Sequence, residues 1–191
     1  MQAEVTKKRF TVEEYYKMDE AGILAADVHT ELVDGEIIEV MRMGPRHASV
    51  LSRIIHLFVE LYDRKVVLRS QLPFGIGPYS ELEPDVALFR VAEKSYSSKH
   101  PGPSDALLVL EIADSSLTYD RDIKLKIYAA ANVPEVWIAD LRGDSLLVFR
   151  DPSTSTYKTS LSFNRDASIS CLAFPDATDA GKFCAHRGIA R

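Results

Sequence analysis

The chain has 191 residues, and its 46% hydrophobic and 27% charged residues are typical of a globular protein with a sizeable core. Its formal net charge of −5 counts mildly against a broadly basic surface that grips long stretches of nucleic acid, so any basic surface must be local. The apolar runs are too short to span a bilayer, and no apolar segment follows the basic residues near Met1 as it does in a secretory signal. We therefore expect a single cytoplasmic domain over 1–191, with its core at about 10–150 and no membrane partner.

The two cysteines, Cys171 and Cys184, lack the spacing of a metal site. They are predicted to be buried or incidental thiols in a reducing compartment, and a disulfide between them stays open as an alternative.

The first elements along the chain are a helix and a hairpin. Thr11 and Glu14 have the spacing of a capping box, which predicts a helix from about Val12 to Ala21. The segment Thr30–Val40 places an Asp-Gly pair, favoured in type I′ turns, between two apolar stretches and therefore predicts two antiparallel strands.

A second helix is predicted to begin near Pro45, because proline suits the first helical position. Its apolar residues recur at spacings of three and four and so form one stripe for packing: Val50, Leu51, Ile54, Phe58 and Leu61. His47 falls at the edge of this stripe.

Three short strands are then predicted over Val66–Leu72, Asp85–Phe89 and Leu107–Ile112, with a loop over Lys94–Ser104. A third helix follows from about Asp120 to Ala131.

The remaining strands are predicted over Glu135–Asp140, Ser145–Arg150 and Tyr157–Phe163. Trp137 on the first of them is expected in the core. Hairpins supply several strands, so we expect an α/β fold with a sheet flanked by helices rather than a doubly wound one.

Glu111 interrupts a strand whose residues are apolar in both alternating sets, which predicts burial on both faces. A carboxylate there is costly unless it is paired, protonated or bound to a metal. Asp85 stands at the start of another apolar strand. If the two strands are neighbours, both carboxylates converge at one strand end and, with a backbone carbonyl and waters, make a hard oxygen site for Mg²⁺ or Mn²⁺.

The alternative is that each carboxylate pairs separately with an arginine or lysine, or lies at a solvated strand end. For either residue alone this alternative is favoured. For the two together, on apolar strands, the two interpretations are equally supported.

The third helix supplies a cation, since Asp120, Lys124 and Tyr128 are spaced by four and share one face. Ile123 and Ile127 beside them are expected to turn this face toward the sheet, so that the lysine reaches the strand carboxylate. A lysine beside a metal-bound water can orient or help to deprotonate it and can offset charge on a phosphate. On spacing alone, a surface ion pair between Asp120 and Lys124 is the stronger interpretation.

Five short motifs follow one another in a fixed order. They are Glu31-Leu-Val-Asp-Gly-Glu36, Gly44-Pro-Arg-His47, Pro84-Asp85 followed by Glu111 on its apolar strand, Tyr119-Asp-Arg-Asp-Ile-Lys-Leu-Lys-Ile-Tyr128, and Ala131-Asn-Val-Pro-Glu-Val-Trp-Ile138. Each is weak alone, but the ordered set over about Phe10–Asp140 is specific. It resembles the PD-(D/E)XK nuclease superfamily, and most closely the branch called the putative restriction endonuclease family, a domain of unknown function.

The resemblance implies a restriction-endonuclease-like fold, with a central mixed β-sheet flanked by helices and the site at one sheet edge. It also implies Mg²⁺-dependent hydrolysis of phosphodiester bonds in DNA. Asp85 and Glu111 would then be metal ligands, Lys124 the catalytic lysine and Glu31 an additional acidic residue of the site. Ala113 departs from the general motif, which has lysine two residues after the acid. The resemblance implies that in this branch the lysine lies on the following helix, and Lys124 fits that position.

Four more residues are candidates to line the site: His47, Gln71, Asp120 and Tyr128. His47, near a helix N-terminus, could contact a phosphate, but a partly buried, hydrogen-bonded histidine is the favoured alternative. Gln71 lies on the strand before Asp85. Its side chain could approach the metal, or it could simply be a polar residue of an edge strand, and the two interpretations are equally supported.

Two functions follow from these residues. The first is a metal-dependent endonuclease, for which a homodimer would supply the two sites needed to cut both strands of a duplex. The second, motivated by Ala113 and the acidic net charge, is a nucleic-acid-binding or regulatory protein that keeps the fold but is catalytically weak or inactive.

Overall fold

The computed structural model describes residues 6–92, 96–164 and 167–177. The strands are β1 (Thr30–Val33), β2 (Glu36–Glu39), β3 (Val66–Arg69), β4 (Phe74–Gly75), β5 (Glu81–Leu82), β6 (Val86–Arg90), β7 (Ala106–Ala113), β8 (Glu135–Asp140), β9 (Ser145–Pro152) and β10 (Tyr157–Asn164). The helices are α1 (Val12–Glu20), α2 (Pro45–Tyr62), α3 (Leu117–Tyr119) and α4 (Leu125–Ala130). Short 3₁₀ turns η1 (Asp63–Lys65) and η2 (Pro103–Asp105) and a π-helical turn η3 (Asp120–Lys124) complete the elements.

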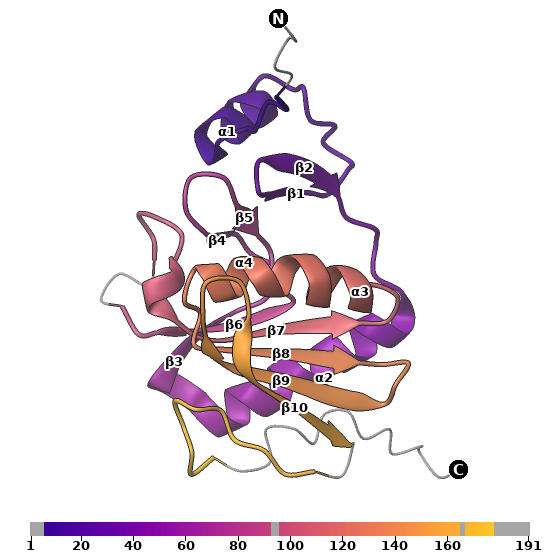
Figure 1. Ribbon diagram of the computed structural model, residues 1–191, viewed down its shortest axis with the longest axis vertical. Coiled ribbons are helices and arrows are strands. Elements are labelled where there is room, and N and C mark those ends of the chain that lie inside the picture. The colour runs from indigo at the N-terminus through magenta and orange to yellow at the C-terminus, as the bar shows by residue number, and fades with distance from the viewer. Residues whose placement is uncertain (1–5, 93–95, 165–166, 178–191) are drawn as a thin grey trace, which may run out of the picture.

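The larger sheet has six strands in the order β10-β9-β8-β7-β6-β3 (Figure 1). β7 and β8 are parallel and are joined by α3, η3 and α4, whereas the other neighbours pair antiparallel. The expected α/β fold with a mixed sheet flanked by helices is therefore confirmed.

Each face of this sheet has its own core, because alternate residues of a strand point to opposite faces. On β7, Leu108 and Leu110 pack in the cluster that includes α2, whereas Val109 and Ala113 pack in the cluster that includes α4. Glu111 has the same parity as the second pair. It is therefore a carboxylate on the apolar face below α4, and Trp137 is fully buried in the core as predicted.

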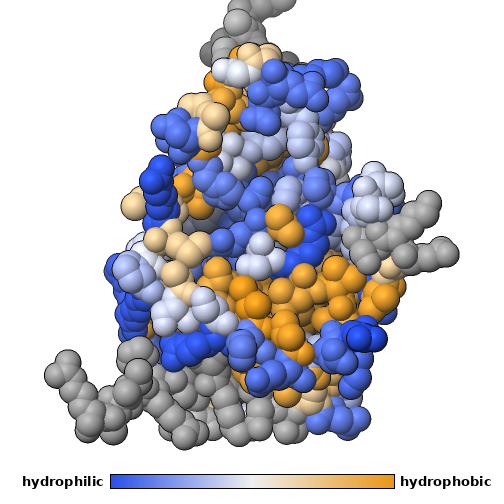
Figure 2. Space-filling model, turned by 180° about the vertical axis from the view of Figure 1, so that it is seen from behind, coloured by the Kyte–Doolittle hydropathy of each residue, from blue (hydrophilic) through white to orange (hydrophobic). Residues whose placement is uncertain are grey.

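α2 covers the face of the larger sheet that is turned away in Figure 1. Seen from behind, a continuous apolar area is bordered by strongly hydrophilic side chains (Figure 2). Half-buried apolar residues that pack against the α2 core include Ile55, Val66 and Leu68.

The smaller sheet has four strands in the order β2-β1-β5-β4. Its hairpin turns at Asp34 and Gly35, whose φ angles of 50° and 81° suit the predicted type I′ turn. A Cβ on Gly35 would lie 2.6 Å from the Cβ of Arg9, so glycine is required here by space as well as by conformation. β4 and β5 were not predicted, because two residues are too few to show a periodicity.

The first two helices begin as predicted. Thr11 and Glu14 form the capping box of α1, and α2 has proline at its start. The described residues contain no helix long and apolar enough to cross a membrane. Cys171 is buried, and its candidate partner Cys184 lies outside the described residues.

Three predicted details are wrong. The third helix begins at Leu117 rather than Asp120 and contains a π turn, in which the Leu125 N–H bonds to the Asp120 carbonyl. Ile123 does not face the sheet: it is 43% exposed, and Leu125 is buried in its place. β3 ends at Arg69, so Gln71 follows the strand in a left-handed conformation with φ 51°.

Candidate active site

Asp85 and Glu111 lie side by side at one end of the larger sheet. β6 and β7 pair with Val86 opposite Leu110, which brings Asp85, just before β6, next to Glu111. The Asp85 N–H donates to Glu111 Oε2 over 3.4 Å, and the Ile112 N–H donates to Asp85 Oδ2 over 2.8 Å. The structure thus brings the two predicted carboxylates together, as neighbouring strands require.

Lys124 joins this pair to the smaller sheet. Its Nζ lies 3.0 Å from Oε1 of Glu31 on β1 and 3.4 Å from Oε1 of Glu111 on β7. The lysine and both carboxylates are buried. The π turn η3 directs Lys124 inward from the crossover between β7 and β8, and π turns are frequent at functional sites.

The surface ion pair between Asp120 and Lys124 does not form. Both residues are buried, and Asp120 instead accepts a 2.6 Å hydrogen bond from the Ser116 hydroxyl. Tyr128, one turn further on, donates its hydroxyl to Glu111 Oε1 over 2.6 Å. All three residues of this helical face therefore point toward the carboxylates.

His47 and Gln71 both contact Asp85. His47 Nε2 lies 2.9 Å from Asp85 Oδ1, and Gln71 Nε2 donates to the same oxygen over 3.1 Å. The Ser70 hydroxyl also donates to the Asp85 carbonyl, so the chain after β3 is held against Asp85. His47 thus lines the cluster and is partly buried and hydrogen-bonded, as the favoured alternative predicts, whereas its contact with a phosphate stays a prediction.

Burial dominates the electrostatics of the cluster. It raises the pKa of Glu111 to about 8, and the charges of Asp120, Asp85 and Glu31 act in the same direction against Lys124. Burial likewise raises the pKa of Asp120. Although burial opposes the charge on Lys124, the carboxylates around it, Glu111 first, raise the pKa of its ammonium, which stays charged.

The imidazole of His47 is tuned by Asp85. Partial burial alone would lower the pKa of His47, but the hydrogen bond and charge of Asp85 outweigh it, and the net shift is upward. The ring is held as a hydrogen-bond partner of a carboxylate at the N-terminal turn of α2.

The donor chemistry of the cluster fits a hard divalent cation. The buried carboxyl groups of Glu31, Glu111 and Asp120 act on the Lys124 ammonium, and that of Asp85 lies beside Glu111, so negative charge is in surplus. Glu31 Oε2 is buried and has no hydrogen-bond partner within the described residues. Such an oxygen is costly unless a cation or water meets it.

The arrangement sets a limit on how the protein could bind the ion. Within the described parts of the chain, no three histidine, cysteine, aspartate or glutamate side chains are grouped so that they could hold a metal. Mg²⁺ does not require this, because it is usually bound through one or two carboxylates and keeps several waters. Asp85 and Glu111 fit that smaller number.

Tyr119 is a residue of the cluster to which the sequence assigned no role. Its hydroxyl is buried without a hydrogen-bond partner in the described structure, and burial together with Glu31 raises its pKa to about 12. The only signal in the sequence was its place at the start of the motif that ends at Tyr128.

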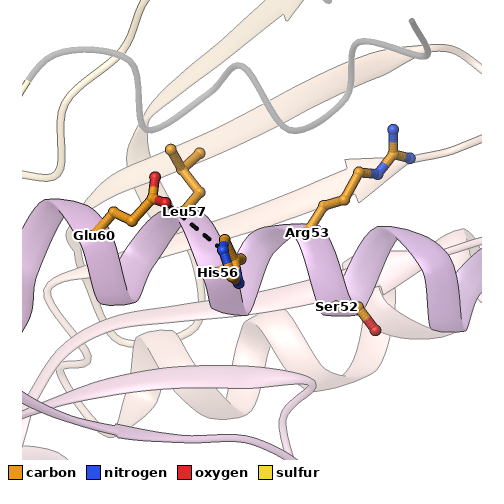
Figure 3. A pocket seen from close by; sticks show the side chains of 5 residues that line it. All are labelled: Ser52, Arg53, His56, Leu57 and Glu60. Atoms are coloured by element: carbon orange, nitrogen blue, oxygen red, sulfur yellow. Dashed lines mark ion pairs between the residues drawn. The ribbon is translucent and has the colours of Figure 1, made fainter. Parts of the chain in front are cut away.

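A shallow hollow on α2 lies elsewhere. It is lined by Ser52, Arg53, His56, Leu57 and Glu60, all from one side of the helix (Figure 3). His56 and Glu60 form an ion pair of 3.7 Å there. None of the candidate residues lines it, so the hollow is separate from the carboxylate cluster.

Comparisons with known proteins identify the family of the chain. The family Uma2, described as "Putative restriction endonuclease", matches residues 12–181. The chain belongs to this family. No curated protein matches it.

The Uma2 fold is also similar to a solved structure. A crystal structure from Anabaena variabilis ATCC 29413, described as a putative nuclease belonging to DUF820, superposes with a TM-score of 0.68. The two chains are 14% identical over 92% of this chain and 99% of the other, so the likeness concerns the fold. The family supports a nuclease at a coarse level, with a nucleic acid as substrate.

Proposed function

We propose that this Uma2 protein is an Mg²⁺-dependent endonuclease that hydrolyses phosphodiester bonds in DNA. The observation that carries the proposal is the buried ammonium of Lys124 between Glu31 and Glu111, beside Asp85. A lysine next to two adjacent carboxylates is what metal-assisted phosphodiester hydrolysis needs.

Each residue has a role in this proposal. Asp85 and Glu111 would hold Mg²⁺ or Mn²⁺, which when bound supplies a Lewis acid for the scissile phosphate and lowers the pKa of a water. Lys124 orients the attacking water and offsets negative charge on the phosphate. Glu31 holds the lysine in place, and Tyr128 fixes Glu111 through Oε1.

The position of Lys124 also bears on the second candidate function. Ala113 suggested a protein that has lost its catalytic lysine, but an ammonium lies 3.4 Å from Glu111 from another element. The absence of lysine from residue 113 therefore gives no reason to expect an inactive site. The acidic net charge remains the observation that favours a weak or regulatory protein.

The test is cleavage of supercoiled plasmid and of single-stranded DNA by the purified chain with Mg²⁺, Mn²⁺ or a chelator. Metal-dependent cleavage is expected, and Asp85→Ala is expected to reduce its rate by roughly 10³-fold or more. Asp122→Ala is the matched control, because Asp122 lies in the same crossover but pairs with the exposed Arg121. A homodimer is expected to give linear plasmid directly, and a monomer to give nicked circles first.

Two results would contradict the proposal. Cleavage that survives Asp85→Ala would show that this cluster is not the active site. Absence of both cleavage and calorimetric Mn²⁺ binding at millimolar metal would favour the regulatory protein.

A further inference from the structure

Cationic side chains gather along one edge of the larger sheet. They are Arg64 and Lys65 in η1, Arg69 at the end of β3, Arg90 at the end of β6 and Lys99 in the loop before η2. We refer to these five residues as the basic edge. All are exposed except Arg69, which is half-buried.

Within the residues that the structure describes, the basic edge forms no ion pair with an acidic side chain. By contrast, the basic residues near the N-terminus, Lys7, Lys8 and Arg9, each pair with a carboxylate. In a chain of net charge −5, cations that form no ion pair within the described residues give this edge a local positive potential that attracts an anionic partner.

The basic edge extends along β3. At one end Lys65 adjoins Val66, which pairs with Arg90 across β3 and β6. At the other end Arg69 lies 3.4 Å from Nδ1 of His100, the residue after Lys99. β3 therefore separates the cations at its two ends by the length of a four-residue strand, roughly 10–13 Å, with Arg90 on the α2 face of the sheet and Arg69 on the α4 face.

This edge leads to the candidate active site. Arg69 pairs with Ala87, which has the same parity as Asp85 and so lies on the same face of the sheet. Just beyond Arg69, Ser70 and Gln71 both donate to Asp85.

The carboxylate cluster is also most open on the Asp85 side. The side chains of Asp85 and His47 are 12% and 16% exposed, whereas those of Glu31 and Glu111 are 1% and 4% exposed. We therefore expect a substrate to reach the cluster past Asp85, where β3 ends.

We propose that the basic edge binds the phosphate backbone of a DNA strand and guides it to the Asp85 end of the cluster. The inference rests on the proposed function and names the surface that this function requires. A DNA strand carries one phosphate per 3.4 Å of helix axis, so the length of β3 matches about three to four phosphates. Exposed lysine and arginine contact such phosphates without reading sequence.

The test compares two charge-matched double variants in an Asp85→Asn background, which keeps the probe intact. Lys65→Gln with Arg69→Gln removes two cations of the basic edge. Lys126→Gln with Lys158→Gln removes two exposed cations from α4 and from β10, the opposite edge of the same sheet. The probe is a fluorescent DNA duplex of fixed sequence, with its single strand and an RNA of the same sequence measured in parallel by anisotropy.

The basic-edge variant is expected to bind DNA about tenfold more weakly near 50 mM salt, and to lower the slope of log K against log salt by about 2. The control pair is expected to change affinity less than about twofold, because its cations lie away from the path. Equal weakening by both pairs, no effect of either, or a preference for RNA over DNA would overturn the inference.

The same two pairs, in the chain that keeps Asp85, separate this inference from the proposed function. If the chain that keeps Asp85 cleaves DNA and the Lys65→Gln, Arg69→Gln variant binds DNA normally, the basic edge is not the DNA-binding surface, while the proposed nuclease activity is supported. If the chain that keeps Asp85 does not cleave DNA, and only the Lys65→Gln, Arg69→Gln variant loses DNA binding, the basic edge is supported as a DNA-binding surface and the proposed hydrolase activity is contradicted.

Discussion

At the scale of single residues, the site is governed by the competition between burial and charge at Glu111. A carboxyl that is 3% exposed beside three others is harder to ionise than in water, although the charge of Lys124 opposes this effect. Tyr128 and the Asp85 N–H occupy its two oxygens with donors, so the group is held in one orientation. These donors favour the ionised form, so the raised pKa comes from burial and the neighbouring carboxylates and not from the contacts that orient the group.

This competition predicts how stability depends on pH. The native pKa of Glu111, about 8, lies above its ordinary value of 4.5, so the folded chain binds this proton more tightly than the unfolded chain. Its contribution is fully present below about pH 4.5 and is lost as pH rises through about 8. Urea unfolding with a chelator present is expected to lose at least about 1 kcal/mol from pH 5.5 to 8.5 on account of this residue.

Glu111→Gln should flatten the dependence of the free energy of unfolding on pH, because the amide has the shape of the carboxyl group but does not titrate. Glu39→Gln, at an exposed position on β2, should leave the wild-type slope unchanged. Equal slopes for wild type and Glu111→Gln would show that Glu111 is ionised throughout.

At the scale of elements, β8 holds the chain that follows β10. Glu135 is fully buried at the start of β8, where it accepts hydrogen bonds from Trp137 Nε1, Arg150 Nε and the Leu172 N–H. Arg150 in turn donates to the Ser170 carbonyl. One carboxylate therefore connects two strands to the segment 167–177.

Glu135→Ala is expected to lower the free energy of unfolding by about 3 kcal/mol, because it leaves the partly buried Arg150 without its counter-charge. The control is Glu60→Ala, which removes an exposed ion pair on α2 and is expected to cost less than about 0.5 kcal/mol. Urea unfolding measures both. Similar values for the two variants would mean that Glu135 is not the residue that secures this segment.

The elements also show how far the sequence could predict the fold. Periodicity and capping predict α1, α2 and the long strands, because each signal is local and repeats within the element. The π turn η3 has no such signature, and without it the buried side of the third helix was assigned to Ile123 rather than Leu125.

The candidate site was predictable in part for a similar reason. A lone carboxylate in an apolar strand pointed to Glu111, and strand neighbourhood was enough to bring Asp85 beside it. The contact of Lys124 with Glu31 spans 93 residues and depends on how the two sheets pack, so no local pattern contains it.

At the scale of the whole molecule, the site is assembled where the smaller sheet meets the larger one. Glu31 comes from β1, whereas Asp85 and Glu111 belong to the larger sheet and Lys124 bridges them. The geometry of the site therefore depends on a hairpin whose turn lies against the segment before α1.

Gly35→Ala tests this dependence at a distance from the cluster. The new Cβ would meet Arg9 at 2.6 Å in a left-handed conformation, so either the segment at Arg9 or the hairpin must shift, and we expect the hairpin to move and carry Glu31 with it. Cleavage is expected to fall about tenfold or more. Gly22→Ala has a similar positive φ but nothing within 4 Å, and it should lose some stability while keeping its activity. Equal plasmid cleavage by the two variants would show that Glu31 is not needed in its present place.

The position of Lys124 has a consequence for how such sites change in evolution. The ammonium reaches Glu111 from a helix, although residue 113, on the same face of β7, is where the general motif carries it. A chain with lysine at both positions could lose either one and keep an ammonium at the acid. A linear motif that requires lysine two residues after the acid would therefore pass over this chain, although its ammonium reaches the same carboxylate in space.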